Sequence, residues 1–446
     1  MIKKILFINA LLLLSATLFA QAETENETKT KKISFGVLPT ISYDADMGFQ
    51  YGGLGSVYDH ASGTLYPDYR QMLKIEISRY TKGSGINQLF YDAKHLLPFG
   101  LRLTADLSYL TEQKLDFFGF NGYQSRYNSN FVDDQSAEYI SRVFYANQRE
   151  FFKFNVDLQG ELFFENLRWL AGFGIMNTKI NRVDIAKLNK GQDAADQLPD
   201  VPTLYDKYID WGILSEAERD GGQTNFLKFG AIYDTRDNEA APETGVWTEA
   251  LLFYVPTYFF NSEFSYAKLV LTYRQYFPVI KNKLTFAVRL GYQGTIGGNA
   301  PFFTQSYMIT SVSSVNKSDG LGGAKNLRGV MRNRVVGDGI VQGIAELRWK
   351  ALSVNLWNQN ISFGVNAFFD CGQVVQTLSF DRSLIPIQAQ TDFFDFSYTN
   401  DRLHTSAGAG LRIALNHNFI LSVDYGFALN RKDGIGGLYI NIGNLF

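Results

Sequence analysis

The segment that most constrains the fold lies between Gly320 and Lys350. It begins as a glycine-rich stretch with one isolated arginine, Arg328, between Leu327 and Gly329. It ends in residues that alternate between two sides of the chain. The apolar side has Val341, Ala345, Leu347 and Trp349, and the polar side has Gln342, Glu346, Arg348 and Lys350. A period of two predicts a β-strand with one apolar and one polar face. A long loop with one marked arginine therefore leads directly into a two-faced strand.

The N-terminus has the three parts of a secretory signal peptide. These parts are the basic Met1–Lys4, the apolar Ile5–Phe19 and the small-residue site Ala20-Gln21-Ala22. The apolar run is shorter than the roughly 20 residues of a membrane helix. We therefore expect residues 1–22 to be a signal peptide, cleaved after Ala20 or Ala22, and the charged residues 23–32 to be a short periplasmic leader.

The rest of the chain has the character of a membrane β-barrel. No later segment has the roughly 20 continuous apolar residues of a membrane helix. An exported chain of alternating, aromatic-rich strands is typical of the outer membrane of Gram-negative bacteria, whereas a secreted soluble β-protein is the alternative. The net charge of −2 argues against a nucleic-acid partner. The single cysteine, Cys371, excludes an intrachain disulfide framework.

Along residues 33–446 the alternation predicts an all-β, transmembrane antiparallel barrel of about sixteen strands, with long extracellular loops. The strands are expected near 33–43, up to 58, 71–81, 88–97, from 102, 139–159, 167–180, 225–234, 246–255, 264–277, 284–295, 341–350, 361–376, 403–415, 419–429 and 437–446. Short links near 98–100, 279–283 and 416–418 alternate with long ones. Outer-membrane barrels have short periplasmic turns and longer external loops, so both termini are expected in the periplasm.

In such a barrel the apolar faces meet lipid and the polar faces line the lumen. Asp370 lies on the polar face of its strand, within Phe368-Phe369-Asp370-Cys371-Gly372, and Cys371 faces lipid. The loop that carries Arg328 is long enough to fold into the lumen. A bidentate pair between Arg328 and Asp370 would latch the loop there.

These motifs resemble those of the BamA/TamA superfamily of bacterial surface antigens, whose barrels have sixteen strands. Leu327-Arg328-Gly329-Val330 is similar to the family's loop element, with Val330 in place of the usual aromatic residue. Phe368, Asp370 and Gly372 are similar to the family's F-x-D-x-G pattern, and Glu346-Leu347-Arg348 is similar to its E-L-R. Asp234-Thr235-Arg236-Asp237 is similar to the family's D-T-R-D turn. Gly408–Arg412 and Asn441–Phe446 are similar to its closing strands. The resemblance implies a loop docked in the lumen, with Arg328 bound near Asp370 and Glu346.

Members of that family that insert proteins carry periplasmic POTRA domains before the barrel. Here only the leader separates the expected cleavage site from the first strand, so a POTRA-less member is expected. The insertase role therefore does not transfer directly. Besides outer-membrane lipid, separate periplasmic or outer-membrane proteins remain open as partners.

The sequence gives little support to an enzymatic function. Its four histidines, His60, His95, His404 and His417, lack the H-E-x-x-H spacing of a zinc site, and no G-x-S-x-G element occurs. The glycine clusters at 320–323 and 337–339 do not join a strand to a helix, as dinucleotide-binding loops do. We therefore expect no catalytic, metal or cofactor site.

Closure of the barrel pairs the first strand with the last. Pro39, in the first strand, has no N–H for a ladder, and Gly436, Gly437 and Gly443 weaken the last strand, which is expected to run to Phe446. We predict fewer or weaker hydrogen bonds at this seam than at any other junction. Three functions remain open: protein assembly or translocation through an opening seam, a gated or plugged pore, and a scaffold whose loops bind a partner. Alternatively, the weak seam is a simple defect of barrel closure without a function.

Overall fold

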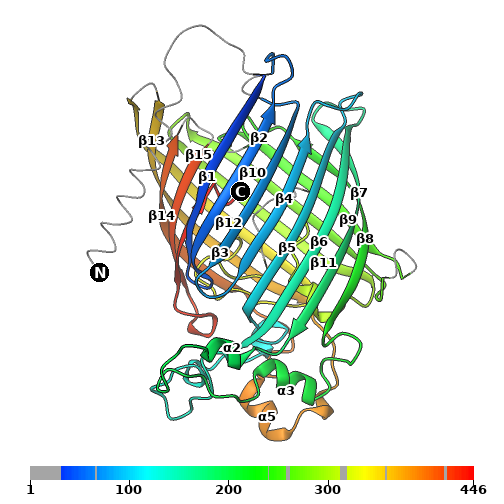
Figure 1. Ribbon diagram of the computed structural model, residues 1–446, viewed down its shortest axis with the longest axis vertical. Coiled ribbons are helices and arrows are strands. Elements are labelled where there is room, and N and C mark those ends of the chain that lie inside the picture. The colour runs from blue at the N-terminus through cyan, green and yellow to red at the C-terminus, as the bar shows by residue number, and fades with distance from the viewer. Residues whose placement is uncertain are drawn as a thin grey trace.

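The computed structural model describes residues 32–65, 68–239, 241–257, 262–311, 319–356, 359–415 and 419–446. The expected signal peptide and residues 23–31 of the expected leader lie outside these ranges. The described chain forms one closed antiparallel barrel in which every strand pairs with its neighbours in sequence and β1 pairs with β16 (Figure 1). The sixteen-stranded barrel predicted from the alternation is thus the observed fold.

The strands are β1 (Ile33–Asp44), β2 (Gly48–Asp59), β3 (Gln71–Tyr80), β4 (Gly85–Ala93), β5 (Arg102–Asp116), β6 (Ala146–Glu161), β7 (Leu167–Asn181), β8 (Gly221–Asp234), β9 (Gly245–Val255), β10 (Tyr266–Ile280), β11 (Leu284–Gly298), β12 (Gly339–Leu356), β13 (Gln359–Gln376), β14 (His404–Leu415), β15 (Phe419–Ala428) and β16 (Gly437–Ile442). The connections hold short helices, α2 (Ile185–Asn189), α3 (Leu204–Asp210), α4 (Phe302–Gln305) and α5 (Ile387–Phe393), and single 3-10 turns, η1 (Gly122–Gln124), η2 (Ser129–Phe131), η3 (Arg382–Leu384) and η4 (Arg431–Asp433). Across the described ranges, no helix is both long and apolar enough to cross a membrane.

Several predicted strand ends differ from the observed ones, and three of them have a local cause. The strand predicted over 88–97 ends at Ala93, because Lys94 and His95 turn away to Asp68, each at 3.1 Å. The strand predicted from 139 begins at 146, because the apolar residues before it pack among the loops. The last strand, predicted to reach Phe446, ends at Ile442.

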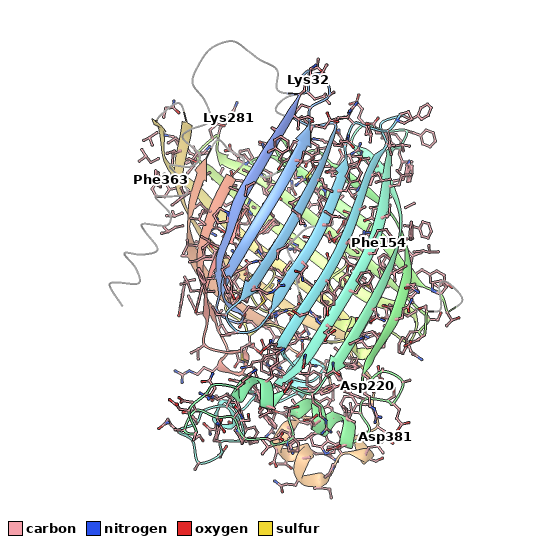
Figure 2. All side chains as sticks on the ribbon, in the orientation of Figure 1. Lys32, Phe154, Asp220, Lys281, Phe363 and Asp381 are labelled. Carbon is pink, nitrogen blue, oxygen red and sulfur yellow. The ribbon has the colours of Figure 1, made fainter. Side chains whose placement is uncertain are left out.

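The two mouths of the barrel differ in their connections. Lys32 and Lys281 lie at the mouth with the short turns, and Asp220 and Asp381 lie at the mouth with the long loops (Figure 2). Helices α2, α3 and α5 are all at the long-loop mouth (Figure 1). The hairpins β1–β2 and β3–β4 are the exceptions, since their tight turns also lie on the long-loop side.

The pleat sorts the side chains as the alternation predicts. On β3, Glu76 is 3% exposed inside the barrel, whereas Ile75 and Ile77 are about half exposed on its outer surface. A closed barrel satisfies its backbone hydrogen bonds between strands, which a sheet with free edges in lipid cannot do. The buried polar groups therefore lie inside, where the side chains of a functional site would be.

The long connections form a second core of their own. The rings of Phe117 and Tyr208 meet edge to face at 5.2 Å, and Phe144, Phe302 and Phe394 are buried in the same cluster. These residues come from four connections far apart in sequence. Edge-to-face aromatic pairs add about 0.5–1.5 kcal/mol each beyond burial. The long loops therefore pack as one body instead of extending separately.

Candidate functional site

The connection between β11 and β12, residues 299–338, is here called the plug loop. Isolated bridges Leu321↔Val335 and Gly323↔Leu327 fold it back on itself. Leu321, Leu327 and Val330 are fully buried and pack with Ile340 of β12 and Val374 of β13. Val330, which stands where the resembled family has an aromatic residue, thus fills a small aliphatic cluster. The loop that the sequence predicts to dock in the lumen is in contact with the inner wall.

Arg328 is bound by three strands at once. Its Nε and Nη2 donate to the two oxygens of Asp370, each at 2.9 Å, and its backbone N–H donates to the same carboxylate at 3.1 Å. Its Nη1 donates to Glu346 at 2.6 Å and to Asp424 at 3.3 Å. Burial lowers the pKa of an arginine, but Glu346 and Asp370 outweigh it and hold the pKa of Arg328 above its ordinary value. The guanidinium is therefore a fixed charge, and we call this group the latch.

The latch is balanced in charge and tightly packed. Arg348 donates to Glu346 at 2.7 Å, and Arg412 donates to Asp424 at 2.7 Å. The three acidic groups are thus matched by three arginines. The ring of Phe368 lies 3.5 Å from the Arg328 guanidinium carbon, which makes a cation–π contact.

Two glycines allow the plug loop to approach the wall this closely. Gly329 has φ of +93°, and a Cβ there would lie 2.5 Å from the backbone between Gly426 and Phe427. A Cβ on Gly372 would lie 2.6 Å from Leu321. The sequence-predicted residues Leu327, Arg328, Gly329, Glu346, Phe368, Asp370 and Gly372 thus all lie in or beside the latch.

A second anchor of the plug loop was missed by the sequence reasoning. Arg332 donates to Asp319 at 2.5 Å and also to Glu112 of β5. Arg149 of β6 donates to Glu112 at 2.7 Å and to Asp319 at 2.9 Å, which closes a buried ring of alternating charge. The only signal in the sequence is that Arg332 follows Arg328 by four residues in a glycine-rich loop.

A third anchor ties the plug loop to the long-loop mouth. Arg334, 1% exposed, donates to the backbone oxygens of Gly122 and Ser125 at 3.1 and 3.0 Å and lies 3.7 Å from Asp433. Tyr123 donates to Asp433 at 2.6 Å. Burial raises the pKa of Asp433, but the hydrogen bond with His404, the charge of Arg334 and the hydrogen bond from Tyr123 together hold it below its ordinary value.

The seam between β1 and β16 is the shortest junction of the barrel. Its pairing consists of Tyr43↔Ile440 and Asp44↔Tyr439, whereas β15 pairs with β16 along all six residues of that strand. Pro39 lies in the part of β1 that pairs with β2 only. A cavity of about 320 Å³ lies beside this stretch and is lined by residues that include Pro39, Thr40 and Asn441.

The end of the chain turns away from the wall. Gly443 has φ of +94°, and after it Phe446 packs inside the barrel on Tyr276, with ring centroids 6.2 Å apart. Arg348 donates to the Phe446 backbone oxygen at 2.9 Å and stacks on its ring at 4.8 Å. The residues beyond Ile442 therefore do not extend the seam, which is why the predicted last strand was too long.

The plug loop also holds β16 from within. The N–H of Gly329 donates to the Tyr439 hydroxyl at 3.1 Å, and Lys325 donates to Asn441 at 2.8 Å. Arg348 joins the latch to Phe446. The last strand therefore has few bonds to β1 but several to the lumen.

No metal centre is apparent in the described ranges, where no three His, Cys, Asp or Glu side chains gather to hold an ion. Cys371 is half-buried and unpaired by any disulfide. The features found here are thus the ion-pair networks that hold the plug loop and the short junction between β1 and β16.

Comparison with known proteins gives a family and a fold. The Omp85 superfamily domain matches residues 71–446. BamA from Haemophilus ducreyi lacking POTRA domains 1–3 has a TM-score of 0.54 and 15% identity, covering 92% of this chain and 70% of that one. CdiB from Escherichia coli has a TM-score of 0.54 and 12% identity, covering 94% of this chain and 63% of that one. No curated protein sequence matches. At these identities the two structures show a shared barrel fold.

Proposed function

The chain belongs to the Omp85 superfamily, whose BamA and CdiB barrels are outer-membrane proteins, and from this premise we propose that it assembles or translocates proteins by opening sideways at its seam. The observation that carries the proposal is the junction of two residue pairs between β1 and β16. A strand edge with free N–H and C=O groups is a template for another strand. An incoming strand would pair with the free edge of β1.

The plug loop supports a controlled opening over a permanent one. It holds β16 through Tyr439 and Asn441 and is itself fixed to β12, β13 and β15 by Arg328. If β1 moves away from β16, only the two backbone pairs break. If β16 moves instead, its side-chain bonds to the plug loop break as well. We infer that β1 is the strand that moves and that β16 stays with the plug.

A disulfide lock tests the proposal. Tyr43 and Ile440 are directly opposite, and facing residues of an antiparallel pair have Cβ atoms about 4.5–5.5 Å apart, close enough for a disulfide. Tyr43→Cys with Ile440→Cys, made in a Cys371→Ser background, should fail to rescue the growth or membrane defects of a deletion strain while oxidised. Addition of a reductant should restore the rescue.

The matched control locks a junction that is already long. Ile41 and Tyr51 face each other within the β1–β2 hairpin, and a disulfide there leaves the seam free. Ile41→Cys with Tyr51→Cys should therefore rescue under both conditions. If the oxidised seam lock supports every cellular phenotype that the control supports, the seam does not open in function.

A separate partner is part of the proposal, because a barrel that receives clients needs them delivered. The full chain should retain periplasmic or outer-membrane proteins when it is purified from native membranes in mild detergent. Recovery of the barrel alone, after chemical cross-linking in cells, would count against a partner.

A plugged pore is the second candidate, favoured by a cavity of about 670 Å³ that reaches from the plug loop to the short-turn mouth. Single-channel conductance separates it from the first. A pore should conduct in bursts in the native state, whereas a seam-opening barrel should stay closed until the plug is destabilised.

A further inference from the structure

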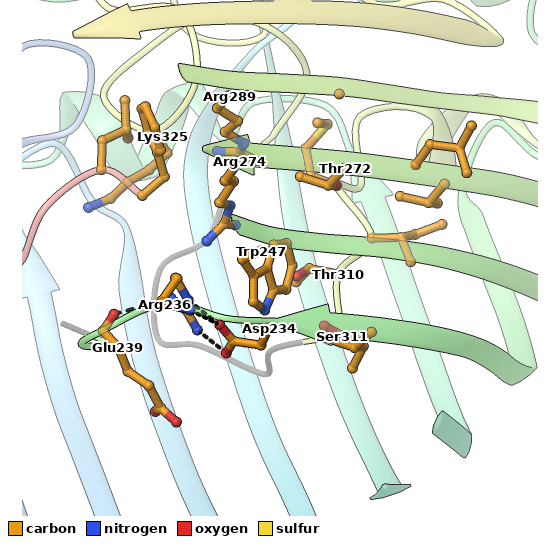
Figure 3. A pocket seen from close by; sticks show the side chains of 18 of the residues that line it. Asp234, Arg236, Glu239, Trp247, Thr272, Arg274, Arg289, Thr310, Ser311 and Lys325 are labelled. Atoms are coloured by element: carbon orange, nitrogen blue, oxygen red, sulfur yellow. Dashed lines mark hydrogen bonds and ion pairs between the residues drawn. The ribbon is translucent and has the colours of Figure 1, made fainter. Parts of the chain in front are cut away.

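The lumen contains a pair of arginines that nothing in the latch or the seam uses. Arg274 of β10 and Arg289 of β11 are direct cross-strand partners, and both line the large cavity on the short-turn side of the plug loop. Figure 3 shows them one above the other on neighbouring strands, next to Trp247 of β9. Like charges directly opposite each other in a sheet are destabilising. A pair kept in this position therefore calls for a compensating negative charge.

The described chain does not supply that charge by contact. Among residues 32–446 outside the undescribed gaps, no carboxylate lies within 4.0 Å of either guanidinium. Seven other arginines inside the barrel reach a carboxylate: Arg102, Arg149, Arg236, Arg328, Arg332, Arg348 and Arg412. The nearby Glu249 acts on the pair only from a distance, and its oxygens accept from Thr272 at 3.2 Å and from the Ser311 N–H at 3.0 Å.

The remaining neighbours hold the pair in place without neutralising it. The Arg274 guanidinium carbon lies 4.2 Å from the Trp247 ring centroid, a cation–π contact. Arg236 lies 5.8 Å from the same ring but is bound bidentately by Asp234. The Nε atoms of Arg274 and Arg289 are buried without an acceptor. Both side chains line the cavity.

The cavity is also lined by a hydroxyl group without a partner in the described chain, and it is open at one end. Ser311 of the plug loop lines the cavity and is 1% exposed, and within the described residues its hydroxyl has no hydrogen-bond partner. The volume is about 670 Å³, and the lining continues to Glu161 and Asn166 at the β6–β7 turn. Ligand pockets are typically about 300–1,000 Å³. The space therefore admits a molecule larger than a single ion from the short-turn mouth.

We propose that Arg274 and Arg289 form a binding site for a phosphate group. A guanidinium presents paired N–H donors that match a phosphate, and Arg is preferred over Lys where such recognition matters. Two adjacent guanidinium groups require two negative charges, which one phosphate monoester carries in large part at neutral pH and one carboxylate does not. The phosphate belongs either to a soluble phosphate ester or to a lipid headgroup that reaches into the mouth. This site does not depend on opening of the seam.

The direct test is calorimetric titration of the full chain, purified in phosphate-free detergent, with inorganic pyrophosphate. Saturable binding is expected, weakened at least tenfold by Arg274→Gln or Arg289→Gln and lost in the double variant. Arg289→Lys, which keeps the charge and loses the fork, should bind with intermediate affinity. Heat-dependent mobility of each variant on gels establishes that the barrel is folded.

Arg168→Gln is the matched control, because Arg168 lines the same cavity at its mouth and donates to the Gly100 oxygen instead of a carboxylate. It should change affinity by less than twofold. Absence of binding, or equal weakening by Arg168→Gln, would overturn the proposal, since the cavity would then attract anions only through its diffuse charge.

The source of the phosphate is settled by two further probes. Glycerol 3-phosphate in detergent represents the soluble ester, and phosphatidic acid in nanodiscs represents the lipid. Arginine-dependent binding of either supports the site and names its source. If neither competes with pyrophosphate, the arginine pair is not a phosphate-ester site.

Discussion

The β12–β13 junction and the seam are opposite extremes of one barrel. β12 and β13 have 18 residues each and pair from Gly339↔Gln376 to Leu356↔Gln359. β16 has 6 residues and meets β1 at two pairs. The long junction also carries Glu346 and Asp370, which hold the plug loop. The barrel thus has the most backbone pairs where the plug loop is anchored and the fewest where the sheet closes.

The contrast shows how a closed sheet can combine permanence with opening. In lipid every unpaired backbone group costs several kcal/mol, so a uniform barrel has no place at which to part. Here the missing pairs lie next to a cavity whose lining includes Thr40 and Asn441. The plug contributes side-chain bonds to β16 that backbone pairing does not provide.

The largest expected effect is the all-or-none accessibility of loop tags, which shows which mouth of the barrel faces the cell exterior. Tags inserted in the loops 181–223 and 378–402 should be accessible on intact cells, whereas tags at Pro98–Gly100 or Asn416–Asn418 should not. The turn at 416–418 lies outside the described residues. Antibody labelling before and after permeabilisation gives the answer. The reverse pattern would place the unpaired stretch of β1 nearer the cell surface and invert the proposed route.

Amide hydrogen exchange compares the two junctions directly. Residues 33–42 of β1 have no partner in β16, so amides on that edge should exchange at least about a hundredfold faster than those of β12 and β13. Mass spectrometry of the folded barrel in nanodiscs measures both segments in one sample. Equal protection would mean that something else covers the β1 edge.

Loss of the latch should be the largest energetic change. Arg328→Ala leaves Glu346 and Asp370 buried with one cation fewer, and breaking a buried pair on one side costs about 3–5 kcal/mol. We expect earlier heat unfolding and a raised conductance. The comparison with Asp370→Ala and the double variant gives the coupling energy. Additive effects would show that the two residues do not act as a pair.

Gly329→Ala should weaken the plug without altering any charge. The new Cβ would lie 2.5 Å from the backbone of β15, at a φ of +93°. Strain of this kind costs about 1–3 kcal/mol. Gly53→Ala is the control, since a Cβ there meets nothing within 4 Å. Thermal unfolding of both variants in one detergent compares them, and an equal shift would contradict the close approach of the plug loop to β15.

Tyr439→Phe should have the smallest effect. It removes the acceptor of the Gly329 N–H, and one buried hydrogen bond contributes about 0.5–1.5 kcal/mol. We expect little change in unfolding but more frequent seam opening, measured as faster alkylation of the reduced Tyr43→Cys and Ile440→Cys pair by a thiol reagent added outside the barrel. Unchanged reactivity would separate the plug loop from the seam.

The sequence by itself determined the features that depend on local periodicity and on residue type. Alternation identified the strands and their lumenal faces, and the isolated Arg328 with Asp370 identified the latch, partly through a family resemblance. Pro39 and the glycines of the last strand indicated a weak closure. Each of these features depends on a few neighbouring residues. The side chains of a strand alternate between its two faces every two positions, and proline removes a hydrogen-bond donor at its own position.

Only the tertiary structure decided what depends on register and on closure. The ring of Glu112, Arg149, Asp319 and Arg332 joins segments up to 220 residues apart. The inward turn after Gly443 follows from packing of Phe446 inside the barrel, so the last strand is shorter than its alternation. Arg274 and Arg289 become neighbours through the β10–β11 register, and a slip of one residue would turn one of them toward lipid. Periodicity gives a strand its two faces, but the closed sheet alone fixes which side chains meet.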